Sequence, residues 1–234
     1  MVVIKQVIYI LVFYLLAQLP AMAIWQSASM SETLKIFACV SVMCLMTVLV
    51  AENYRRKLSL SLADIGLHYP SAAGIRKHAA PVLGAAAAGF AFFALYFAVF
   101  RLLFPSAYAD LLVKNGTGLL RSLLEWRQNS IAGLAALVLG QFILAVAEEF
   151  LFRGVIYNYL LRNMSWKKAV AWSSVVFAVI HLHPASLPLY FALGALFCWL
   201  YRRSGSLLVP VLCHFLYNLA LVMLGEHLLA GAFK

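Results

Sequence analysis

Apolar residues along this chain gather into about seven runs, which are separated by short polar or basic segments. The runs lie near residues 6–25, 33–52, 79–104, 130–160, 168–183, 187–201 and 206–225. A helix needs about 20 apolar residues to cross a hydrocarbon core that is about 30 Å thick. The fifth and sixth runs are close to the lower limit of that length, whereas the fourth exceeds it and is expected to tilt or to project from the membrane. The pattern therefore predicts an all-α polytopic transmembrane helical bundle of about seven spans.

The composition supports membrane insertion. Of the 234 residues, 65% are hydrophobic and 11% are charged, and the mean hydropathy is +0.93. Soluble domains average about 45–50% apolar and about 25% charged residues. The net charge of +10 does not indicate a nucleic-acid partner, because the basic residues stand singly or in short clusters between apolar runs. We therefore expect an integral, multi-pass membrane protein that contacts lipid and no nucleic acid.

The connections between the runs predict an orientation and two surface segments. With the N-terminus inside, the inner loops hold more lysines and arginines than the outer loops, which favours an N-in, C-out topology. The first run ends in Ala21-Met22-Ala23, but it is long enough to span and is interpreted as an uncleaved helix. Residues 53–78 combine basic residues with Leu62, Ile65, Leu67 and Tyr69 and are predicted to lie on the inner leaflet. Residues 105–129 are predicted to form an amphipathic helix on the opposite surface.

Two adjacent glutamates, Glu148 and Glu149, interrupt the fourth apolar run, and Arg153 follows one turn later. A charged side chain near the bilayer centre costs about 2.5–3.5 kcal/mol on insertion scales, so such residues mark interior or functional positions. Glu149 and Arg153 are four residues apart and share a helix face, whereas Glu148 points about 100° away. A carboxylate that is paired with arginine makes a poor base. The spacing therefore favours Glu148 as the reactive group and the Glu149–Arg153 pair as its support.

The fifth and last apolar runs contain polar side chains that can act together with the glutamates. His181 ends the fifth run, and His214 and Asn218 lie one turn apart in the last run. An imidazole transfers protons near neutral pH, and an asparagine amide donates to a developing oxyanion. Taken singly, each of these residues has a structural interpretation as a helix-packing or interhelical hydrogen-bonding group. Taken together with the glutamates, they form a plausible set for amide hydrolysis between helices.

Other chemically distinctive residues receive structural interpretations. The four cysteines all lie in apolar runs without a CxxC pair and are expected to be buried thiols. The aromatic residues near the ends of the late runs are assigned to the interfacial belt of a membrane protein. These residues are Tyr157, Tyr190, Trp199 and Tyr201.

Three motifs in a fixed order carry a family resemblance. The chain reads Glu-Glu-x-x-x-Arg at 148–153, Phe-x-x-x-His at 177–181 and His-x-x-x-Asn at 214–218. This series resembles the CPBP family of CAAX proteases and bacteriocin-processing enzymes, also called ABI-domain intramembrane proteases. The resemblance implies a CPBP-like catalytic core at 130–225, preceded by N-terminal transmembrane spans and interfacial segments at 1–129 and followed by a short C-terminal tail at 226–234. One structural domain and a location in the plasma (inner) membrane of a prokaryote are expected.

The same resemblance implies a glutamate-dependent intramembrane endopeptidase. Glu148 would activate a water together with His181, while His214 and Asn218 would stabilise the oxyanion. The substrate would be a peptide bond of a membrane-associated, lipidated or leader- or tail-bearing protein or peptide, and the sequence does not choose among these.

Metal dependence and two rival functions stay open at this point. Glu148, His181 and His214 can in principle ligate Zn²⁺, whose catalytic sites use three protein ligands and a water. The chain has no His-Glu-x-x-His, and we expect no cofactor. One rival is a non-catalytic membrane scaffold or immunity protein, in which the Glu149–Arg153 pair only holds helices together. The other is a proton-coupled transporter, which the lack of an internal repeat disfavours.

Overall fold

A computed structural model describes residues 2–27, 29–30, 32–67, 72–106, 131–182 and 184–230. Its elements are α1 (Val2–Ala17), α2 (Leu19–Trp25), α3 (Glu32–Lys57), α4 (Ala72–Leu103), α7 (Ile131–Glu149), η1 (Phe150–Tyr157), α8 (Asn158–Asn163), α9 (Trp166–Val179), η2 (Pro184–Ser186), α10 (Leu187–Ser204) and α11 (Leu208–Ala230). Within these ranges all regular structure is helical, which confirms the predicted all-α bundle.

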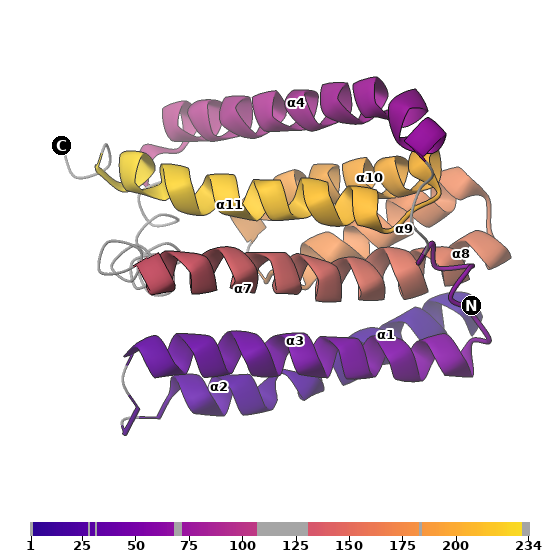
Figure 1. The fold of residues 1–234 in the computed structure, drawn as a ribbon, viewed down its shortest axis with the longest axis horizontal. Coiled ribbons are helices and arrows are strands. Elements are labelled where there is room, and N and C mark those ends of the chain that lie inside the picture. The colour runs from indigo at the N-terminus through magenta and orange to yellow at the C-terminus, as the bar shows by residue number, and fades with distance from the viewer. Residues whose placement is uncertain are drawn as a thin grey trace.

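The long helices run side by side, as Figure 1 shows, with α7 between α3 and α11. The helices α1 and α2 pack on α3, and α9 packs extensively on α10. Helix α4 lies beyond α10 and α11 at one edge of the bundle. The centrally placed α7 therefore carries its glutamates into the interior of the protein.

Each predicted apolar run coincides with helical structure, although the lengths differ. Four stretches of the described chain are long and apolar enough to cross a membrane, namely Val2–Trp25, Leu34–Lys57, Leu83–Leu103 and Pro184–Ser204. Helix α9 has only 14 residues, which at 1.5 Å per residue gives a length of about 21 Å. It is therefore shorter than the thickness of a hydrocarbon core.

The fourth run does not continue as one regular α-helix. Immediately after Glu149 the chain widens into the π-helix η1, in which Leu151 to Tyr157 are all buried. Such wide turns are rare and often occur at functional sites. At Gly154 an added Cβ would lie 3.1 Å from the Phe150 ring and 3.6 Å from Ile65, so the absence of a side chain lets a neighbouring loop approach.

That loop corrects the prediction of an inner-leaflet segment at 53–78. Helix α3 continues to Lys57, and residues 58–67 turn back onto the bundle. Ile65, which was expected at the membrane surface, is 0% exposed, whereas Leu62 and Leu67 are each 54% exposed. The prediction is therefore wrong for Ile65, which packs into the bundle, whereas Leu62 and Leu67 stay exposed. Hydrogen bonds attach the loop to the protein. Tyr69 lies outside the described residues.

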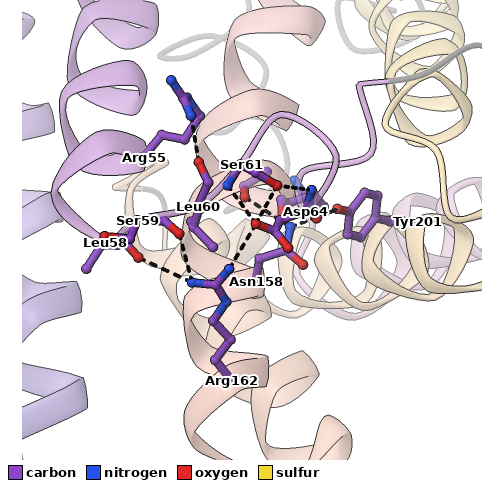
Figure 2. Close-up of polar contacts among 11 residues, drawn as sticks. Arg55, Leu58, Ser59, Leu60, Ser61, Asp64, Asn158, Arg162 and Tyr201 are labelled. Carbon is purple, nitrogen blue, oxygen red and sulfur yellow. Dashed lines mark hydrogen bonds and ion pairs between the residues drawn. The ribbon is translucent and has the colours of Figure 1, made fainter.

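The attachment of the 58–67 loop is shown in Figure 2. Arg162 of α8 donates to the carbonyl oxygens of Leu58 and Ser59 and pairs with Asp64 at 2.9 Å. Tyr201 of α10 donates from its hydroxyl to the Asp64 carbonyl at 3.1 Å. The loop thus ties the end of α3 to α8 and α10, on the side of the bundle where η1 ends.

Two further predictions meet different outcomes. Tyr157 and Tyr201 are buried inside the bundle, at 0% and 6% exposure, so their assignment to an interfacial belt is wrong. The hydroxyl of Tyr201 also accepts a hydrogen bond from Asn158 at 2.7 Å, a polar role that the hydropathy pattern does not reveal. Most of the predicted amphipathic helix at 105–129 lies outside the described residues. All four cysteines are free and buried, as expected.

Candidate active site

A buried ion pair lies at the junction of α7 and η1. Arg153 Nη1 donates to Glu149 Oε1 at 2.7 Å, and both side chains are 0% exposed. The second terminal nitrogen of Arg153 donates to the Gly194 carbonyl of α10 at 3.3 Å. The guanidinium carbon also lies 4.4 Å from the centre of the Phe177 ring and 5.0 Å from that of Phe197, which are cation–π distances. The pairing expected from the i, i+4 spacing is therefore present, and it links three helices.

His214 of α11 lies between the two glutamates. Its Nδ1 is 2.8 Å from Glu149 Oε1, and its Nε2 is 3.7 Å from Glu148 Oε2. The imidazole stacks on the Phe197 ring at 4.9 Å with an interplanar angle of 22°. Because a carboxylate accepts at Nδ1, that nitrogen carries a proton and the opposite nitrogen faces Glu148. The ion pair thus fixes the orientation of the His214 ring.

Glu148 points away from the ion pair, as the helical spacing predicts, and keeps some access, with a side chain that is 12% exposed. Its charge interacts with Tyr14 of α1, Cys44 of α3 and Tyr190 of α10. Tyr14 and Cys44 belong to the N-terminal region, in which the sequence carries no recognisable motif. The first helices therefore line one side of the Glu148 carboxylate.

His181 lies in the turn that follows the short helix α9. Its Nδ1 is 2.7 Å from the carbonyl oxygen of Phe177, so this nitrogen must donate and Nε2 is left as an acceptor in the neutral ring. The ring stacks on Tyr190 at 3.7 Å and 16°. The assignment of Tyr190 to the aromatic belt is therefore wrong, because its ring holds His181 in place.

Asn218 lies one turn beyond His214 on α11 and is half-buried. Residues four apart share a helix face, so its amide is presented on the same side of α11 as the imidazole. The candidate site thus draws Glu148, Glu149 and Arg153 from α7 and η1, His181 from the end of α9, and His214 and Asn218 from α11.

Glu148, His181 and His214 carry side chains of types that bind metals. Across the described part of the chain, no group of three or more His, Cys, Asp and Glu side chains is placed to hold a metal ion.

Known proteins are similar to this chain in the region that holds the candidate site. Residues 129–220 match the family model described as Type II CAAX prenyl endopeptidase Rce1-like. Over these residues the chain is similar to the CAAX endopeptidases that this model describes. The chain is 30% identical over 88 residues to the putative membrane peptidase YdiL of Bacillus subtilis, covering 38% of this chain and 36% of that protein. It is 34% identical over 77 residues to the membrane-embedded CAAX protease MroQ of Staphylococcus aureus, covering 30% of this chain and 31% of that protein.

These matches cover only part of this chain and of each relative. This chain spans about a third of the length of the curated relatives that it matches. No solved structure matches it. The matched region begins before α7 and ends within α11, so it contains every residue of the candidate site. The family model and the two relatives therefore support a membrane protease.

Proposed function

We propose that this protein is a glutamate-dependent intramembrane endopeptidase. One observation carries the proposal: Glu148 lies 3.7 Å from His214, whose other nitrogen is held by the buried Glu149–Arg153 pair. A carboxylate left beside an oriented imidazole in a dry interior is suited to proton transfer. The Glu149 carboxylate is already neutralised by Arg153 and serves to position His214.

In the first step, Glu148 takes a proton from a water molecule. His181 accepts a hydrogen bond from that water through Nε2, because its Nδ1 proton is engaged by the Phe177 carbonyl. The oxygen of the water then attacks the scissile carbonyl carbon and forms a tetrahedral oxyanion. Glu148 holds the proton at the end of this step.

In the second step, the oxyanion collapses and the C–N bond breaks. Protonated His214 donates from Nδ1 to Glu149 and from Nε2 to the oxyanion, and the Asn218 amide donates alongside it. Glu148 returns its proton to the leaving nitrogen, so the carboxylate is regenerated. Arg153 balances the charge of Glu149, which allows that residue to hold an imidazolium without adding net negative charge to the site.

The proposed substrate is a membrane-associated, lipidated or leader- or tail-bearing protein or peptide. The location is proposed to be the plasma membrane of a prokaryote, in keeping with the bacterial sources of both relatives. The Glu148 side chain keeps 12% of its surface exposed within the bundle, which suits a substrate that enters from the membrane.

The test compares the wild type with Glu148→Gln, His181→Ala and Asn218→Ala in membranes of the source cell, with peptide fragments read by mass spectrometry. Each variant should lose the same specific fragments, and Asn218→Ala should lower the rate by on the order of 10²–10³, as removal of one oxyanion donor does in other hydrolases. Glu52→Gln makes the same chemical change at an ion pair with Arg55 and serves as the matched control.

The rival scaffold function predicts a different result. A scaffold tolerates Glu148→Gln, because the amide keeps the shape of the carboxylate and part of its hydrogen bonding. Persistence of both the fragments and the cellular phenotype in Glu148→Gln, at equal expression, would reject the peptidase.

A further inference from the structure

A groove of about 520 Å³ lies between α4, α9 and α10, outside the candidate active site. Its walls are small or apolar side chains, among them Ala88, Gly89 and Phe92 of α4, Val170 of α9, and Ala195 and Leu196 of α10. The volume lies within the range of about 300–1,000 Å³ that is typical of ligand pockets. None of the described residues that line it is acidic.

One end of the groove is positively charged. Arg202 and Trp166 both line the groove, and the Arg202 guanidinium lies 5.0 Å from the centre of the Trp166 ring. The Lys167 ammonium lies 5.8 Å from the same ring. In the described structure neither cation forms an ion pair with a carboxylate. Two cations on one indole, without an internal counter-ion, make a site that attracts an anion from outside.

Helix α4, which forms one wall of the groove, is only loosely attached to the rest of the protein. In Leu83–Leu103 of α4, only 6% of the most apolar window is buried inside the protein. Figure 1 shows α4 along the edge of the bundle, above α10 and α11. An apolar groove beneath such a helix exposes its walls to the bilayer, so an inserted hydrocarbon chain would bury surface on both α4 and α10.

We propose that this groove binds one anionic phospholipid, with an acyl chain along Ala88 and Gly89 and the headgroup phosphate at Arg202. An apolar groove alone would accept any acyl chain, and the cations at its end select the negative headgroup. Basic pockets between transmembrane helices at the cytoplasmic side bind anionic headgroups in this way. The orientation predicted from the basic loops places Arg202 at that side.

The groove is separate from the chemistry but shares a helix with it. Helix α10 presents Leu196 to the groove and the Gly194 carbonyl to Arg153. A lipid that seats α4 against α10 therefore stabilises the helix that supports the ion pair. This inference does not depend on the proposed peptidase activity.

Native mass spectrometry of the purified protein tests the headgroup selection. The protein is titrated with phosphatidylglycerol and with phosphatidylcholine of identical acyl chains. Wild type should bind phosphatidylglycerol at least about fivefold more tightly, which corresponds to one basic contact at the membrane surface. Arg202→Gln should abolish this preference, whereas Arg203→Gln, at the adjacent exposed position outside the groove, should keep it. Equal behaviour of the two variants would overturn the proposal.

A second pair of variants tests the acyl-chain position. Ala88→Leu fills the groove and should weaken the binding of both lipids, whereas Ala87→Leu, at an exposed position of α4 that does not line the groove, should not. Ala195→Leu on the α10 wall repeats the test where Ala88→Leu lowers the thermal stability. If Ala88→Leu leaves lipid binding unchanged and instead blocks cleavage of a lipidated peptide, the occupant is the substrate's own lipid and the proposal is wrong.

Discussion

The buried Glu149–Arg153 pair allows a quantitative test by double-mutant cycle. Glu149→Gln removes one charge and leaves Arg153 with the Gly194 carbonyl and two aromatic rings. Arg153→Met removes the other charge and leaves Glu149 facing His214. The double variant removes both charges together.

The magnitude follows from the complete burial of both side chains. Loss of one partner of a buried pair costs about 3–5 kcal/mol, because the other charge stays desolvated. We expect Glu149→Gln to reach this range and Arg153→Met to cost less, since His214 Nδ1 still donates a hydrogen bond to Glu149. The double variant should be more stable than the sum of the two single losses predicts, by at least about 1 kcal/mol.

Unfolding in mixed micelles on titration with SDS measures the stability of all four proteins under identical conditions. If the stability loss of the double variant equals the sum of the losses in the two single variants, the view that the pair acts as one unit is refuted. Peptide cleavage supplies a second measurement, because the double variant should recover stability without recovering activity. Its His214 lacks the carboxylate that orients the ring, so full activity in the double variant would also contradict the argument.

Three further perturbations have defined outcomes. Tyr190→Ala should lower kcat by up to about tenfold through loss of stacking on His181, whereas Tyr190→Phe should retain it, and a peptide-cleavage assay separates the two. Gly194→Ala should destabilise the protein by about 1–3 kcal/mol, measured as a lower melting temperature, because the new Cβ would lie 2.9 Å from Ser174 Cα. Hydrogen bonds from Ser61 and the charge of Arg162 hold the pKa of the Asp64 carboxyl below its usual value. The stabilisation from Asp64 is present at neutral pH and lost as the pH falls below about 4, so Asp64→Asn should flatten that part of the stability profile.

Much of the fold follows from the sequence because lipid forces the backbone to satisfy its hydrogen bonds within each segment. Apolar runs therefore become helices, and their number and order are readable from hydropathy. The exception is the 58–67 loop, whose leucines fit a surface segment equally well. Its attachment to the bundle depends on Arg162 and Tyr201, which lie about a hundred residues or more along the chain. Hydropathy is a local property and does not encode such partners.

In the candidate site too, local spacing predicts some features, whereas others depend on how distant helices pack. The i, i+4 spacing of Glu149 and Arg153 determines their pairing from the sequence alone, and the separate direction of Glu148 follows from the helical period. The position of His214 between both glutamates is not encoded in any spacing, because it depends on how α11 packs against α7. The stacking of Tyr190 on His181 likewise requires the turn that ends α9 early.

The N-terminal helices show why a motif search finds only part of such a site. Tyr14 and Cys44 interact with Glu148, yet neither stands in a pattern that differs from ordinary apolar packing. Residues that make chemical bonds need particular functional groups at particular spacings, and these appear as motifs. Residues that only exclude water and enclose a carboxylate need the right volume and position, which many sequences supply. Catalysis in a membrane depends on both, since the same exclusion that strengthens the interactions of Glu148 must still admit one water and one substrate. The helices α1 and α3 therefore contribute to the surroundings of Glu148, although the motifs that carry the family resemblance begin at residue 148.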